Sequence, residues 1–429
     1  MPAHIPAESA AEHDEPHNQR LGPHGSLPRT ILFWFHLACG VVTGIIILIM
    51  SVTGVLLTYD KQIVGWFDAR EFSRTLQASG PTLPLDSLLR LAQQGEPTLK
   101  MSSVTVSSGA VQPVKVVFAR GSAHFIDPRT GIVVRKGESS VRNVFSKVTE
   151  WHRWLGVSEG GRETARAMTG ASNLVFLLLA VTGFFLWFPR ILTWTRVRAV
   201  LLFRGGLRGK ARDFNWHHVL GIWMLIPLLF VVSSGVVISY RWASNLVFRL
   251  AGEAPGGNPS GATGGGERAG GASASREGAP GAPGAPGASA PDSAPAVRYE
   301  AYVAAAAAKV PGWQTITIPL PVTAKKPVAV LIDAGRGGKP QLRSTLTLDA
   351  VTLREKQWLP FAAQSTGRKA RSFLRFVHTG EFFGLIGQTI AGLATLAAVV
   401  LVWTGIALSL RRLAAYLRRT GNDRQEARA

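Results

Sequence analysis

The stretch Ile31–Tyr59, ILFWFHLACGVVTGIIILIMSVTGVLLTY, decides the fold of this chain, because it contains no Asp, Glu, Lys or Arg. About 20 apolar residues are enough for a helix to cross a bilayer, and stretches 167–189, 216–240 and 382–410 also meet this requirement. The first stretch follows a polar segment, residues 1–30, and no small-residue cleavage site ends a short apolar core, so we expect an uncleaved anchor. We therefore predict a membrane α-helical protein with four transmembrane helices.

The composition agrees with a membrane protein. Hydrophobic residues make up 46% of the 429 residues and charged residues only 17%, whereas soluble domains carry about 25% charged residues. The formal net charge is +21, which is compatible with nucleic acid or with a lipid surface. The single cysteine, Cys39, excludes an intrachain disulfide, a zinc–cysteine cluster and a CxxCH haem attachment.

The positions of the basic residues predict the orientation. Residues 190–215 hold seven Lys or Arg with one acid near the end, and the tail 411–429 begins with two arginines. Cytoplasmic loops are enriched in such residues, so we expect both termini in the cytoplasm and segments 60–166 and 241–381 in the periplasm. A basic cluster at 368–375 lies on the predicted outer side and is interpreted as functional. Because the cations gather at membrane ends, nucleic-acid binding is rejected.

The two outer segments have similar predicted elements, which suggests two helix–outer domain–helix repeats, each with a small α+β domain. In the first, a helix at 85–94 precedes strands near 102–106 and 112–119 and a turn at Asp127-Pro-Arg-Thr-Gly131. In the second domain, residues 297–360, a helix at 299–309 precedes strands near 314–318, 327–332 and 344–348. The Gly/Ala/Pro-rich residues 252–296 predict a flexible linker. His124, on a predicted strand, is expected at the surface.

Four histidines form one pair near each predicted face of the membrane. His36 and His217 lie near the inner ends of spans one and three, whereas His152 and His378 lie just outside spans two and four. Ionisable residues in the membrane are costly and suggest function. Three of the four have a glycine one turn later, which leaves space for a flat macrocycle beside the imidazole: Gly40, Gly156 and Gly221.

Paired imidazoles on facing helices can hold a non-covalent haem. Zinc is less favoured, because two histidines lack its third and fourth ligands. Hydrogen bonding between helices is the alternative role. His218, next to His217, lacks a glycine partner and is the second choice as a ligand.

Several motifs resemble the PepSY-associated transmembrane-helix family of bacterial inner-membrane proteins. They are Trp151–Gly156 (WHRWLG), Thr182–Arg190 (TGFFLWFPR), His217–Gly221 (HHVLG) and His378–Gln388 (HTGEFFGLIGQ), with Asp127–Gly131 similar to the end of a PepSY domain. The resemblance extends from about Arg29 to Arg412, apart from the linker. Members include haem-containing siderophore reductases. The resemblance therefore implies two b-type haems, with the four membrane histidines as axial ligands to the iron.

The leading hypothesis is an inner-membrane reductase that passes electrons outward to a ferric siderophore or another ferric chelate. Arginines near the outer face would neutralise haem propionates or attract the chelate: Arg153, Arg162, Arg166, Arg368, Arg371 and Arg375. No dinucleotide fingerprint is present, so the donor is expected to be a quinol or a partner protein. The alternative is a non-enzymatic protein whose outer domains bind a peptide or protease while the helices anchor them in lipid.

Overall fold

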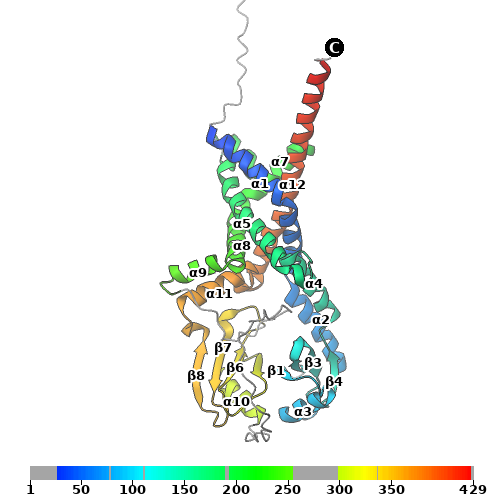
Figure 1. The fold of residues 1–429 in the computed structure, drawn as a ribbon, viewed down its shortest axis with the longest axis vertical. Coiled ribbons are helices and arrows are strands. Elements are labelled where there is room, and N and C mark those ends of the chain that lie inside the picture. The colour runs from blue at the N-terminus through cyan, green and yellow to red at the C-terminus, as the bar shows by residue number, and fades with distance from the viewer. Residues whose placement is uncertain are drawn as a thin grey trace, which may run out of the picture.

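Helices gather at one end of the molecule and a β-sheet at the other (Figure 1). The structure is a computed structural model that describes residues 27–76, 79–109, 112–188, 193–254, 298–335 and 337–426. The polar segment before residue 27 and most of the predicted linker lie outside the described residues. We call the end of the helical bundle that meets the sheet the sheet end, and the opposite end the far end.

The predicted apolar spans fall in long helices: α1 (Leu27–Leu57), α5 (Arg162–Trp187) and α12 (Gly384–Glu426). Within the described part of the chain, three helical stretches are long and apolar enough to cross a membrane. A fourth is formed by α7 (Gly209–Trp223) and α8 (Leu225–Ser239) if this bent pair counts as one span. The chain is therefore a membrane-associated helical protein with three to four candidate spans and an antiparallel sheet.

The third predicted span is broken, because α7 and α8 meet at an angle of 71°. Pro227, in the first turn of α8, has no N–H to donate to the carbonyl of Trp223, and its ring clashes with that carbonyl in a straight helix. Proline at this position therefore places the bend next to Met224, between the two helices. The sequence predicts one span at residues 216–240, and the structure divides it into two helices.

Five further helices connect the spans to the rest of the molecule: α2 (Asp60–Thr75), α4 (Ser140–Trp154), α6 (Trp194–Leu201), α9 (Arg241–Leu250) and α11 (Thr366–His378). Both α4 and α11 begin with a serine N-cap whose hydroxyl accepts a hydrogen bond from a backbone N–H three residues on. These two helices are the important ones for the site, since each carries a predicted histidine in its last turn.

The strands of both outer segments form one eight-stranded sheet in the order β4-β3-β2-β1-β5-β6-β7-β8. We expected two separate α+β domains, but β1 and β5 pair in antiparallel register, with Val104 opposite Ile318 and Val106 opposite Ile316. Pairing removes two open strand edges that would otherwise leave backbone groups unpaired. The strands are β1 (Met101–Ser107), β2 (Val114–Phe118), β3 (Ala123–Ile126), β4 (Val133–Lys136), β5 (Thr315–Pro319), β6 (Val328–Asp333), β7 (Arg343–Leu348) and β8 (Glu355–Pro360).

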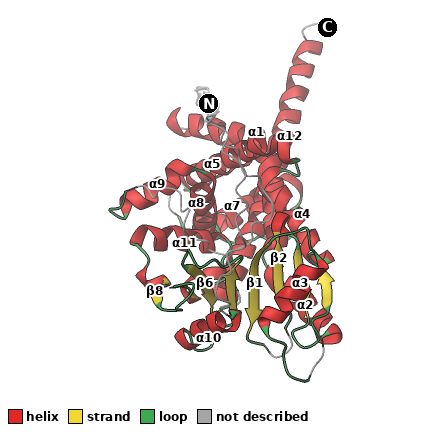
Figure 2. Cartoon of the chain, turned by 60° about the horizontal axis from the view of Figure 1, so that its bottom comes forward, coloured by secondary structure: helices red, strands yellow, loops and turns green. Residues whose placement is uncertain are grey.

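One hydrophobic core serves both halves of this sheet. Helices α3 (Leu85–Gly95) and α10 (Tyr299–Lys309) contribute to it and lie on the face of the sheet turned away from the bundle (Figure 2). Alternate strand residues point into the core, as the period of two requires, and Val104, Ile316 and Ile332 are fully buried. Both helices coincide with the predicted ones. The predicted turn also forms: Asp127 accepts hydrogen bonds from the N–H groups of Arg129 and Gly131.

His124 is not at the surface, so that prediction was wrong. Its side chain is buried because both faces of β3 are covered: α2 packs against Ala123 and Phe125, and α3 contacts the strand as well. Its ring lies 4.7 Å from the ring of Phe118, and its Nε2 lies 3.7 Å from a carboxylate oxygen of Glu96. Burial lowers the pKa of His124, and the nearby Glu96 carboxylate partly offsets this effect.

Ion pairs connect helix α2 both to the sheet and to the last span. Arg135 on β4 donates to Asp68 and Glu71 of α2 at 2.9 Å each, and its guanidinium lies over the ring of Phe125. Lys61 at the start of α2 lies 2.9 Å from the buried carboxylate of Glu381, just before α12. The first cluster thus holds β4 against α2, and the second joins α2 to the sheet end of the last span.

Candidate functional site

The sheet end of the bundle brings His152 and His378 together. Their ring centres lie 6.4 Å apart, and the ring planes are inclined by 55°. His152 is in the last turn of α4, which follows β4, and His378 ends α11, which follows β8. The two histidines are therefore delivered from opposite edges of the sheet.

Hydrogen bonds fix the tautomer of His152. Its Nδ1 lies 2.9 Å from the carbonyl of Met50 and 3.0 Å from the hydroxyl of Thr53, both on α1. The Thr53 hydroxyl donates its own proton to the carbonyl of Ile49, so both atoms facing Nδ1 are acceptors. Nδ1 therefore carries the proton, which leaves the lone pair of Nε2 available to a ligand.

His378 repeats this arrangement on α8. Its Nδ1 lies 2.8 Å from the carbonyl of Val231 and 3.3 Å from the hydroxyl of Ser234. The Ser234 hydroxyl donates to the same carbonyl. His378 is thus also protonated at Nδ1, and its Nε2 is free to bind.

The far end holds the second pair, His36 on α1 and His217 on α7, which are close enough to interact electrostatically. Nδ1 of His36 lies 2.8 Å from the Thr182 hydroxyl on α5, and Nδ1 of His217 lies 2.9 Å from the Thr404 hydroxyl on α12. Each threonine donates its proton to a carbonyl of its own helix one turn earlier. With the threonine proton on that carbonyl, each hydroxyl oxygen accepts a hydrogen bond from Nδ1, as at the sheet end.

A glycine follows each of these hydroxyl residues and, in three cases, lies against the imidazole. A Cβ added at Gly54, Gly183 or Gly405 would stand 3.4, 3.3 and 3.5 Å from the Cε1 atom of His152, His36 and His217 respectively. The fourth, Gly235, lies against Asn173 instead. Threonine–glycine pairs on facing helices therefore supply both the acceptor and the space for the ring.

The glycines that the sequence analysis associated with the histidines have other surroundings. A Cβ at Gly40 would meet no atom within 4 Å, and one at Gly221 would meet only Leu401, at 3.7 Å. Gly156 has a positive φ of 73° and packs against the ring of Trp151, so it serves the turn after α4.

His218 has a different kind of partner. Its Nδ1 lies 2.9 Å from the carbonyl of Phe214 in its own helix, and its ring packs against the Phe214 ring with centres 4.0 Å apart. The ring centre of His218 is 6.4 Å from that of His217. No threonine or serine of a facing helix orients it among the described residues, which distinguishes His218 from the other four.

The separation of His152 and His378 fits the axial positions of a haem. Ring centres of two axial imidazoles are about 6 Å apart, because each metal–nitrogen bond is about 2 Å and each nitrogen lies about 1 Å from its ring centre. The separation of His152 and His378 agrees with this value. Among the described residues, no group of three or more His, Cys, Asp or Glu side chains could hold a bare metal ion.

Cations accompany the pair at the sheet end. Arg153, next to His152, lies near enough to Arg166 and Arg375 for their like charges to repel one another. The guanidinium of Arg153 lies 4.8 Å from the ring centre of Trp154, and that of Arg375 lies 5.8 Å from the ring centre of Phe376. Such a group of cations is suited to an anion with several carboxylates or other charged oxygens.

The hydroxyl partners were not predicted as site residues. The signal was present, because a threonine or serine followed by glycine recurs in all four spans at residues 53, 182, 234 and 404. Which histidine each hydroxyl faces becomes clear only from the pairing of the helices. Helix α1 packs against α4 and α5, α8 against α11, and α7 against α12.

The comparisons with known proteins agree with the membrane architecture. No curated protein matches the chain significantly. The family model for the PepSY-associated TM region matches residues 33–412, which include most of each candidate span, the whole sheet and the four oriented histidines. The chain therefore belongs to the PepSY-associated TM region family.

Proposed function

We propose that this protein is a haem-containing reductase of the bacterial inner membrane, which moves electrons from the cytoplasmic side to a ferric chelate in the periplasm. The observation that carries the proposal is the hydrogen bonding of His36, His152, His217 and His378. Each imidazole donates from Nδ1, and so each presents Nε2 as a ligand, two at each end of the bundle. Hydrogen bonding between helices needs no such uniform choice of tautomer.

The basic residues support the orientation. At the far end, Arg204, Arg208 and Lys210 precede or begin α7, and Arg411 and Arg412 continue α12 beyond the apolar stretch. By the positive-inside rule this end is cytoplasmic and the sheet is periplasmic. A topology reporter fused after Arg204 should be active only in the cytoplasm, and one fused after Glu253 only in the periplasm.

Two b-type haems bound to these histidines would supply a one-electron couple near each face of the membrane. The threonine and serine hydroxyls would hold the imidazole planes, and Nδ1–H donation would raise the basicity of each ligating nitrogen. Arg153 and Arg375, beside the sheet-end pair, would bind propionates or hold an oxygen-rich ferric chelate near His152 and His378.

The visible absorption spectrum of the purified protein tests the proposal. Protein purified from cells supplied with haem should show a Soret band that shifts on reduction with dithionite, and pyridine haemochrome analysis should give two haems per chain. Reduced protein should then convert a ferric siderophore to its ferrous form, detected with a ferrous-specific chelator. Colourless folded protein would instead support the non-enzymatic alternative, in which the periplasmic sheet binds a peptide or protease.

A further inference from the structure

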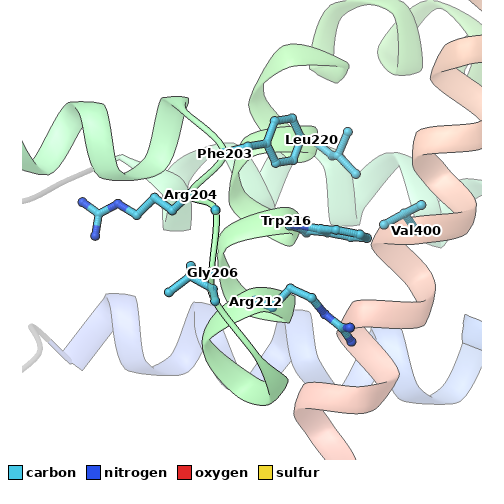
Figure 3. Close-up of a pocket in the computed structure, with 9 residues that line it drawn as sticks. Phe203, Arg204, Gly206, Arg212, Trp216, Leu220 and Val400 are labelled. Carbon is cyan, nitrogen blue, oxygen red and sulfur yellow. The ribbon is translucent and has the colours of Figure 1, made fainter.

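A cavity of about 480 Å³ opens at the far end, beside α7 and α12. Its lining includes Phe203, Trp216, Leu220 and Val400, together with the backbone of Gly205 and Gly206. The Trp216 ring lies between Phe203 and Leu220 on one side and Gly206 and Arg212 on the other (Figure 3). This volume is within the range of small-molecule sites, about 300–1,000 Å³.

The cavity adjoins the far histidine pair. Trp216 directly precedes His217 in α7, and Leu220 lies one turn beyond Trp216 on the same helical face. Val400 lies one turn before Thr404, and the Thr404 hydroxyl both accepts from His217 and donates to the carbonyl of Val400 at 2.7 Å. A molecule in this cavity would therefore contact Trp216, the residue before His217, and Val400, whose carbonyl accepts a hydrogen bond from the Thr404 hydroxyl.

The chemistry of the walls favours an uncharged aromatic head group. The side chains of Phe203 and Trp216 are 57% and 40% exposed, so a planar ring could stack on Trp216 and an apolar tail could leave toward the lipid. The two cations of the lining are directed away from a ligand in the cavity: Arg212 donates to the carboxylate of Asp213 at 2.8 Å while its guanidinium lies 5.5 Å from the Trp216 ring centre, and the guanidinium of Arg204 points away from the other lining side chains (Figure 3). Among the described lining residues, a phosphate would therefore compete with Asp213 for Arg212.

We infer that this cavity binds a membrane quinol, which is the electron donor of the proposed reductase; the inference rests on that proposed function. Oxidation of one quinol breaks its two O–H bonds and gives one quinone, two protons and two electrons. The electrons reduce two ferric chelates to the ferrous state, one electron each, and both protons leave at the cytoplasmic side. A quinol reaches this site laterally from the bilayer, without a soluble cytoplasmic domain.

The test measures quinone binding directly, in nanodiscs that contain the haem-loaded protein and a zwitterionic lipid. The probe is a radiolabelled benzoquinone with a decyl tail, and its Kd is determined by equilibrium partitioning. Val400→Trp should fill the cavity and Trp216→Leu should remove the stacking surface, and each should raise the Kd at least tenfold. Leu393→Trp, on the exposed side of α12 and outside the cavity, is the matched control and should leave the Kd unchanged.

The second readout is reduction of the haems by the decyl quinol, which should slow in proportion, while haem content and reduction by dithionite remain as in the wild type. Equal quinone affinity in all variants would overturn the inference. It would also be overturned if an added anionic phospholipid bound the cavity and unlabelled quinone failed to displace it. If the purified protein contains no haem, the proposed function fails. The binding measurement still decides whether the cavity takes a quinone.

Discussion

The hydroxyl of Thr182 lies 2.8 Å from Nδ1 of His36, although the two residues are 146 positions apart in the chain. The same hydroxyl donates to the carbonyl of Leu178, so it faces the imidazole as an acceptor. One threonine therefore decides which nitrogen of His36 would ligate the iron of the proposed haem, and equivalent hydroxyls lie beside the other three histidines.

Thr182→Val keeps the shape of the side chain and removes the acceptor. We expect haem affinity at the far end to fall about 10- to 100-fold, as for the loss of other partners of a ligating histidine. Haem retained after dialysis against apomyoglobin measures this change. Thr43→Val is the matched control, because the Thr43 hydroxyl bonds only to the carbonyl of Cys39 in its own helix. Equal haem loss in both variants would contradict the role of Thr182.

Substitution of the histidines should separate the two haems. His36→Ala or His217→Ala should remove the far haem and leave the sheet-end haem bound and reducible by dithionite, because the two pairs lie at opposite ends of the bundle. His152→Ala or His378→Ala should do the reverse, and all four variants should lose transmembrane electron transfer. Pyridine haemochrome analysis with redox titration measures each haem.

The same series distinguishes His217 from His218. Since only His217 is oriented by a hydroxyl of a facing helix, His218→Ala should keep both haems. Loss of haem from His218→Ala, with retention in His217→Ala, would move the ligand by one residue. Removal of both haems by every single substitution, in protein that is still folded, would contradict the assignment of pairs.

Ile316→Ala should loosen the junction of the two half-sheets. Ile316 is fully buried on β5, opposite Val106 of β1, and truncation of such a side chain costs about 2–5 kcal/mol. Hydrogen exchange of peptides from β1 and β5 should therefore become faster together. Ile132→Ala, at a 64% exposed position, should leave this exchange unchanged. Faster exchange in β5 alone would show that the halves are not one cooperative unit.

The buried His124 should make the stability of the sheet depend on pH. Burial lowers its pKa in the folded state, so the unfolded state binds a proton first as the pH falls through about 6.5. The free energy of unfolding should therefore decrease from pH 7.5 toward pH 5, and His124→Gln should flatten this part of the curve. The free energy of unfolding of the sheet, obtained from hydrogen exchange of its peptides at several pH values, gives this pH dependence. A free energy that increases toward pH 5 would rule His124 out as the cause.

The sequence predicts what is local and leaves open what depends on distant contacts. Runs without charge locate the spans, and helices at 85–94 and 299–309 were predicted because their patterns are local. The burial of His124 could not be predicted, because it depends on helices α2 and α3, which cover β3. The pairing of β1 with β5 joins segments separated by two spans, and no local pattern reports it. The acceptor roles of Thr182 and Thr404 required the same long-range information.

The continuous sheet also links the two helices that carry His152 and His378. Helix α4 leaves one edge of the sheet after β4 and helix α11 leaves the other after β8, and the eight hydrogen-bonded strands between them have a fixed spacing of about 4.8 Å. The 6.4 Å separation of His152 and His378 therefore depends on a sheet that lies outside the helical bundle. A one-residue slip at any strand pair would shift α4 against α11, so the register of the sheet determines how the two imidazoles face each other.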